Sequence, residues 1–85
     1  MQEEPRSIRL VFVQGTSNKE YNVYLEHREQ TWGVSFTYGR IGGRLMNGTK
    51  TPEAVPHAQA SKIYDDLVAS KIKIGYREEG KPESI

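Results

Sequence analysis

The chain has 85 residues, of which 35% are hydrophobic and 27% charged, and its formal net charge at pH 7 is +1. This length gives one small domain with a thin core, and the absence of cysteine excludes disulfides, a thiol nucleophile and a thiolate metal site. Apolar runs are too short to span a membrane and the polar, acidic N-terminus is not a secretory signal, so we expect a cytoplasmic protein.

The first half of the chain predicts consecutive β-strands. After a disordered lead over residues 1–6, β-branched and aromatic residues favour a strand over residues 7–14. Alternation resumes over residues 19–27, and we expect the two strands to form a hairpin. Its loop, residues 15–19, is longer than the favoured two-residue turn. A charged turn at residues 28–30 leads to the next strand.

The strand that begins at Thr31 carries the strongest pattern in the chain. Four large apolar side chains occupy alternate positions: Trp32, Val34, Phe36 and Tyr38. This period of two indicates a strand with two different faces, and Trp32 is expected to anchor the core. Gly39 then interrupts the strand and Arg40 follows, before a flexible corner at Gly42-Gly43. An arginine held between glycines and beside an aromatic is well placed to bind phosphate or carboxylate.

The second half of the chain predicts a helix. Residues 44–50 form the weakest element, a short fourth strand broken by the turn signal at residues 47–48. Thr51-Pro52-Glu53 is a candidate helix start, although Pro56 lacks a backbone donor and can delay the regular helix to that point. Apolar residues then recur at spacings of three and four: Ala60, Ile63, Tyr64, Leu67, Val68 and Ile72. This amphipathic stripe ends at Gly75, a left-handed cap candidate.

A run of strands followed by a helix predicts an α+β fold. We expect an antiparallel sheet of three to four strands, with one long C-terminal helix packed on one face. The pattern places a single domain at residues 7–76, and the polar residues 77–85 are expected to form a flexible tail.

The middle of the chain is locally positive. No Asp or Glu occurs from residue 30 to residue 52, whereas Arg40, Arg44 and Lys50 lie in this span. A surface of this charge suits a phosphate backbone. The alternative is that three cations occur there by chance and only keep a hairpin hydrated.

The sequence offers no convincing catalytic set. His27 and His57 are isolated and expected at the surface, and they cannot form a metal site without further ligands. Asp65 and Asp66 are adjacent on the predicted helix, so their carboxylates point in different directions. We therefore expect no enzyme activity, no cofactor and no metal.

Three segments together resemble the WGR domain family, a module named for a Trp-Gly-Arg motif and found in several poly(ADP-ribose) polymerases and in bacterial proteins. Asn18-Lys19-Glu20-Tyr21 is similar to the family's Asn-Lys-x-Tyr, and Tyr38-Gly39-Arg40-Ile41-Gly42 to its Trp-Gly-Arg-(Ile/Val)-Gly. Residues 67–76 resemble the Lys-x-x-x-Gly-Tyr end of bacterial members. Two departures fall at the surface that the family uses for DNA: Tyr38 replaces the signature tryptophan, and the loop after Gly42 is short.

The resemblance implies a non-enzymatic nucleic-acid-binding module that recognises the DNA backbone or strand ends. In the polymerases the motif aromatic packs against a terminal sugar, and the arginine with neighbouring polar groups holds phosphate. By position, Tyr38 would stack and Arg40 would hold phosphate, with Gly39 between them. Asn18 and Lys19 would contact the backbone near the terminus. Arg44 and Lys50 would extend the patch as charge alone.

The sequence leaves two alternatives open. Arg40 can instead pair within the chain, with Glu20 or a helix carboxylate, and so fasten the loop to the sheet. The module can also bind another protein through the same face or an open sheet edge. The nucleic-acid interpretation requires Arg40, Arg44 and Lys19 to converge on one surface. The pattern implies neither a membrane nor a small-molecule substrate, and it leaves DNA and RNA undistinguished.

Overall fold

The computed structural model describes residues 4–80. Two tight hairpin turns join its first three strands. β1 (Arg6–Gln14) and β2 (Ser17–Arg28) pair so that Gln14 lies opposite Ser17, which leaves a turn of only two residues. The prediction of a longer loop is therefore wrong, because the pairing of β1 with β2 continues until only the favoured two-residue turn remains. A second two-residue turn leads into β3 (Thr31–Arg40).

The sheet contains five strands, and not three to four. β4 (Leu45–Thr49) pairs antiparallel with β3, and the predicted break within it does not occur. β5 (Arg77–Glu78) adds a short strand to the outer side of β1, in the segment for which a flexible tail was expected. The strand order is β4-β3-β2-β1-β5, and the fold is α+β as predicted. Residues 1–3 of the expected lead and 81–85 of the expected tail lie outside the described residues.

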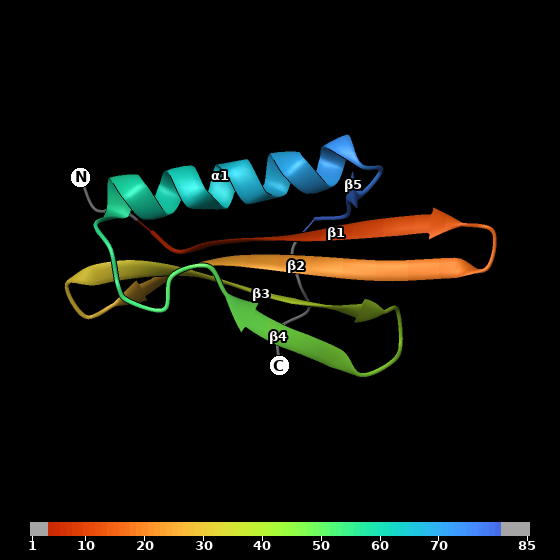
Figure 1. Ribbon diagram of the computed structural model, residues 1–85, viewed down its shortest axis with the longest axis horizontal. Coiled ribbons are helices and arrows are strands. Elements are labelled where there is room, and N and C mark those ends of the chain that lie inside the picture. Colours follow the sequence, from red (N-terminus) through yellow and green to blue (C-terminus); the bar gives the residue numbers. More distant parts are fainter. Residues whose placement is uncertain (1–3, 81–85) are drawn as a thin grey trace.

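A long helix, α1 (His57–Lys73), lies across one face of the sheet (Figure 1). It begins after Pro56, which agrees with the later of the two predicted starts. Thr51 does not cap it. Instead, the Thr51 hydroxyl is buried and accepts a hydrogen bond of 2.9 Å from the backbone N–H of Val34. No helix in residues 4–80 is long and apolar enough to cross a membrane.

The C-terminal end of α1 reverses the chain. Gly75 has a φ of +118°, and its N–H donates to the Ile72 carbonyl at 3.1 Å. The N–H of Tyr76 donates to the Lys71 carbonyl at 3.0 Å. These two bonds form a Schellman motif, the helix end that the sequence predicts at this glycine. The reversal brings Tyr76 back over the sheet and positions β5 beside β1.

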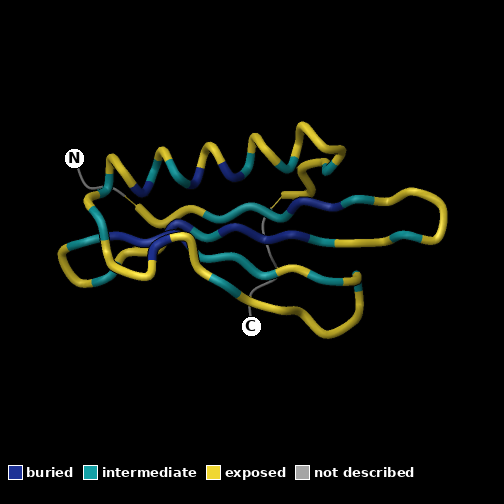
Figure 2. The backbone as a smooth tube through the Cα atoms, in the orientation of Figure 1, coloured by how far each residue is buried: buried dark blue, intermediate teal, exposed yellow. Residues whose placement is uncertain are grey.

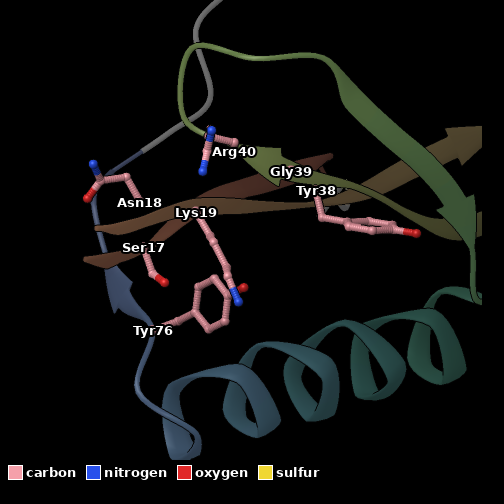
Figure 3. A pocket seen from close by; sticks show the side chains of 7 residues that line it. All are labelled: Ser17, Asn18, Lys19, Tyr38, Gly39, Arg40 and Tyr76. Atoms are coloured by element: carbon pink, nitrogen blue, oxygen red, sulfur yellow. The ribbon is translucent and has the colours of Figure 1, made fainter. Parts of the chain in front are cut away.

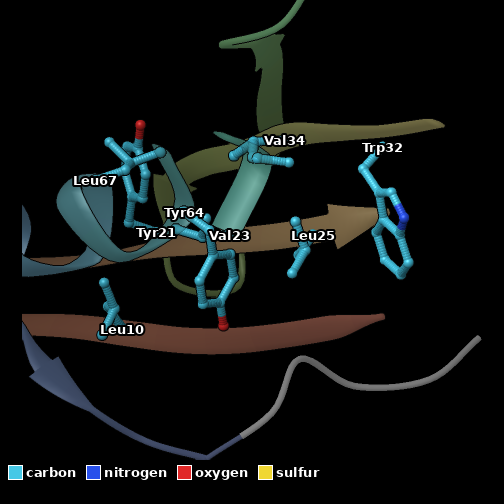
Figure 4. Packing of buried hydrophobic residues seen from close by; sticks show 9 residues of the cluster. Leu10, Tyr21, Val23, Leu25, Trp32, Val34, Tyr64 and Leu67 are labelled. Carbon is cyan, nitrogen blue, oxygen red and sulfur yellow. The ribbon is translucent and has the colours of Figure 1, made fainter. Parts of the chain in front are cut away.

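The core lies between α1 and the covered face of the sheet (Figure 2). Its buried members come from β1, β2, β3 and α1: Leu10, Tyr21, Val23, Leu25, Trp32, Val34, Ala60, Tyr64 and Leu67. Figure 4 shows this cluster, with Trp32 at one end of it. Trp32 is 4% exposed and packs against His27 and His57, with ring centroids 4.6 and 4.7 Å apart. The period-of-two faces and most of the helical stripe were thus predicted correctly, but Ile72 at the end of the stripe is 47% exposed.

Candidate functional site

A groove of about 400 Å³ lies where the ends of β2 and β3 meet the chain that leaves α1 (Figure 3). Seven residues line it: Ser17, Asn18, Lys19, Tyr38, Gly39, Arg40 and Tyr76. Five of them are among the candidate site residues inferred from the sequence. They come from two segments about twenty residues apart in the chain, and antiparallel pairing of β2 with β3 brings these segments together.

Lys19 and Arg40 form the charged part of this groove. The two residues lie directly opposite each other in the β2–β3 ladder, and both side chains are exposed. Within residues 4–80 neither cation forms a salt bridge. Glu20, one of the partners considered for Arg40, instead faces Arg9, with 3.6 Å between Arg9 Nε and Glu20 Oε1. The described carboxylates therefore leave the positive charge of this pair unneutralised.

Tyr38 forms the aromatic part. Tyr38 is 39% exposed, and its ring stacks with that of Tyr21 at a centroid distance of 5.9 Å and an interplanar angle of 21°. Tyr21 in turn contacts the ring of Tyr76 edge-on at 6.1 Å. Burial, and secondarily the nearby phenols of Tyr38 and Tyr76, raises the pKa of Tyr21 above its usual value. The site thus combines an accessible ring with a buried, uncharged aromatic support.

Backbone contacts hold the two motif segments in register. The carbonyl of Asn18 accepts a hydrogen bond of 2.9 Å from the N–H of Ile41 and thereby joins the start of β2 to the loop after β3. Gly39 permits a close approach of the β3–β4 hairpin, since a Cβ at this position would lie 2.7 Å from the carbonyl oxygen of Arg44. These two contacts involve the residues directly before and after Arg40, so they fix the position of its backbone.

The remaining two candidate cations do not line the groove. Arg44 immediately precedes β4 and lies beside the Gly39 backbone, so it is close to the Lys19–Arg40 pair. Lys50 follows the other end of β4, where its N–H donates to the carbonyl of Val34 at 2.9 Å. Three of the cations thus gather near the β3–β4 hairpin, and Lys50 lies along the strand from them.

The sequence profile of the WGR domain family matches residues 5–83, which is nearly the whole chain. The chain belongs to the WGR domain family. Comparison with curated proteins and with solved structures gave no significant match. Across the wider family, the WGR domain is a nucleic-acid-binding module without catalytic function.

Two groove residues of this WGR domain were not among the sequence candidates. Ser17 opens β2, one position before the Asn-Lys motif, and nothing in its local pattern marks it. Tyr76 was considered as the last residue of the C-terminal motif at residues 67–76 and not as a site residue. The Gly75-Tyr76 pair could have indicated this position, because a glycine that ends a helix can reverse the chain and bring the next residue back over the sheet that the helix covers. In Figure 3 the side chains of Ser17 and Lys19 extend towards Tyr76, whereas that of Asn18 points away from it.

Outside the groove, within residues 4–80, the helix aspartates and both histidines contact other side chains. Asp65 lies 3.5 Å from Arg6, and Asp66 lies 3.0 Å from Lys62. Both histidines pack on the ring of Trp32. The described part of the chain contains no group of three or more His, Cys, Asp or Glu side chains that could hold a metal ion.

Proposed function

We propose that this WGR domain binds the DNA backbone, at strand ends or breaks, through the groove between β2, β3 and Tyr76. The observation that carries the proposal is the opposed pair of Lys19 and Arg40. Two cations on neighbouring strands suit the oxygens of a phosphate, and the arginine fork can bind two of them at once.

Tyr38 gives the groove a surface for a sugar or a base. A partly exposed ring that is already supported by Tyr21 loses little conformational freedom when a nucleotide packs against it. Tyrosine offers less contact area than the tryptophan of the family motif, but it retains the face on which stacking depends. Asn18, at the rim, supplies a polar side chain for the backbone near the terminus.

The groove supports recognition of backbone and ends, and not of base sequence. Its cations and aromatic rings match features that every nucleotide shares, whereas base-edge recognition needs hydrogen-bonding side chains inserted into a helical groove. We expect a shallow dependence of affinity on salt, because Lys19 and Arg40 would neutralise only a few phosphates. Arg44 would add charge from the adjacent hairpin.

The test is fluorescence anisotropy with a labelled nicked duplex that carries a 5′-phosphate, at low salt. Arg40→Glu should weaken binding by at least about tenfold, because it replaces a phosphate ligand with a like charge. Lys62→Glu is the matched control: it makes the same change in net charge on the outer face of α1, where the Lys62 side chain is 77% exposed. Equal affinities of the two variants would contradict the proposed site.

The same assay separates the ligand classes. An unphosphorylated nicked duplex, an intact duplex and a single-stranded RNA of equal length share backbone charge but differ in their ends and sugars. Tightest binding to the phosphorylated nick supports end recognition. Equal binding to all four would reduce the proposal to backbone binding alone.

A further inference from the structure

Within residues 4–80, no strand lies beside the outer edge of β4. β4 ends the strand order and pairs only with β3 among the described elements. Beyond β4 the chain leaves the edge and returns at Val55, which forms a single bridge to Trp32. A five-residue segment of sheet edge is therefore open.

The register shows which backbone groups face outward. The N–H of Lys50 donates to the carbonyl of Val34 on β3. Residues of an antiparallel ladder bond to a given neighbour at alternate positions, so Gly48 and Met46 also bond to β3. The N–H and C=O groups of the intervening residues, Leu45, Asn47 and Thr49, then point away from the sheet. These groups are the ones that an added strand would use.

The strand β4 itself lacks several of the features by which proteins block such pairing. Edge strands commonly carry an inward-facing charge, a proline or a bulge. The β4 sequence, Leu-Met-Asn-Gly-Thr, contains no charge and no proline, and its ladder to β3 is continuous.

An apolar contact surface runs along this edge on the side that α1 covers. Met46 is 57% exposed. At Gly48 the ring of Phe36 lies so close that a Cβ would meet its Cζ atom at 2.6 Å. The missing side chain thus lets the Phe36 ring of β3 lie against the β4 backbone at Gly48. An added strand would find Met46 and Phe36 beside its own side chains on this face.

The charges at the two ends of β4 select the partner. Arg44 precedes the strand and Lys50 follows it, and no acid occurs from residue 30 to residue 52. A second copy paired antiparallel about Asn47 would place Arg44 opposite Lys50 at both ends, and like charges directly opposite each other are destabilising. An extended segment with a carboxylate at each end would instead form an ion pair at each end.

We propose that the β4 edge binds an extended peptide segment with acidic residues at its ends, which adds to the sheet as a further strand. Alternate backbone bonds to Leu45, Asn47 and Thr49 align the segment. Apolar residues one position either side of its centre contact Met46 and the Phe36 ring. Acidic residues three positions either side of its centre meet Arg44 and Lys50, on the same face of the sheet.

The probe is a blocked heptapeptide, Glu-Thr-Val-Thr-Val-Thr-Glu, compared with Lys-Thr-Val-Thr-Val-Thr-Lys in NMR titrations of the labelled protein. We expect the first peptide to shift the amides of Leu45, Asn47 and Thr49 and to slow their hydrogen exchange. The second should bind about tenfold more weakly, since two attractive exposed pairs become repulsive. The double variant Arg44→Glu/Lys50→Glu should reverse this preference.

A backbone variant tests the strand-addition geometry independently of charge. Asn47→Pro removes an N–H that points away from β3, a position at which an edge strand tolerates proline. We expect it to keep the spectrum of the folded protein and to lose binding of the acidic peptide. Asn47→Thr, which keeps the N–H, is its control and should bind as the parent does.

Four results would overturn the proposal. The first is equal binding of the two peptides, and the second is unchanged binding by a folded Asn47→Pro variant. The third is a concentration-dependent shift of the β4 amides without peptide, which would make a second copy the occupant. Because DNA binding is read at Lys19 and Arg40, failure here leaves the proposed function unaffected. Peptide-induced shifts at that pair in place of β4 would also count against strand addition.

Discussion

Lys19 on β2 and Arg40 on β3 are directly opposed across the ladder, two positive charges where a neutral or opposite pair would stabilise the sheet. Their closest acidic neighbour in sequence, Glu20, is engaged with Arg9. An unneutralised pair of this kind is a small destabilising feature of the free protein. An anion bound between the two cations would remove the repulsion, which links ligand binding to the stability of this end of the sheet.

The first prediction follows from this repulsion. Arg40→Gln should raise the free energy of unfolding by about 0.5 kcal/mol at low salt, because a like-charge cross-strand pair becomes a neutral one. The gain should shrink as salt screens the parent's repulsion. Urea unfolding at two salt concentrations measures both effects. A lower stability of the variant at low salt would mean that Arg40 has a stabilising partner.

A second prediction concerns the aromatic position of the motif. Tyr38→Ala should weaken DNA binding by about tenfold, the loss expected for one stacking contact. Tyr38→Trp restores the family residue and should bind more tightly than the parent, because the indole buries more area. Anisotropy titrations of both variants give the comparison. Equal DNA affinities of the alanine and tryptophan variants would contradict a stacking role of Tyr38.

Thr51 provides a test of the fold. Its hydroxyl accepts the N–H of Val34 in a site where Thr51 is 3% exposed. Thr51→Val keeps the shape but leaves a buried donor unsatisfied, so we expect a loss of about 1–3 kcal/mol in unfolding free energy. Thr51→Ser retains the hydroxyl and should lose much less. Urea denaturation of the three proteins distinguishes these outcomes, and equal stability of the valine variant would exclude the proposed role.

Alkaline pH should destabilise the protein through Tyr21. Burial raises the pKa of this phenol above 10.0, so the folded state holds the proton more tightly than the unfolded chain does. This contribution is complete below pH 10 and is lost as pH rises through the folded pKa. Stability measured by urea unfolding from pH 9 to pH 11 should fall less steeply for Tyr21→Phe. Tyr64, whose pKa burial also raises, should leave a residual fall in that variant.

Much of the fold could be predicted from the sequence because each long element has one apolar face. The alternation along β3 and the helical stripe of α1 correctly assigned residues such as Val34 and Leu67 to the core. The end of α1 was predicted as well, since Gly75 permits the backbone geometry of the observed cap.

The errors occur where tertiary contacts override local pattern. β5 has only two polar residues, Arg77 and Glu78, and it exists because the helix cap and Tyr76 bring the chain alongside β1. Thr51 has the sequence signature of a helix cap, but its hydroxyl is used by β3. Local propensity could reveal neither pairing, because both join residues far apart in the sequence.

The sequence predicted the candidate site only in part. Lys19 and Arg40 lie opposite each other, a proximity that the nucleic-acid interpretation required, because strand pairing fixes their register. Lys50 was included for its charge alone, and it lies outside the groove. Tyr76 was missed because its place in the groove depends on how α1 ends, and β4 and the whole of α1 separate it from Tyr38 in the chain.

An NMR titration of the labelled protein with a short nicked, 5′-phosphorylated duplex at low salt tests DNA binding through this groove directly. We expect shifts clustered at Asn18, Lys19, Tyr38, Arg40 and Tyr76, which shrink as salt is added. Arg44 should shift less, and Lys50 least. No shifts at high protein and DNA concentrations, or shifts confined to other surfaces, would contradict DNA binding through this groove.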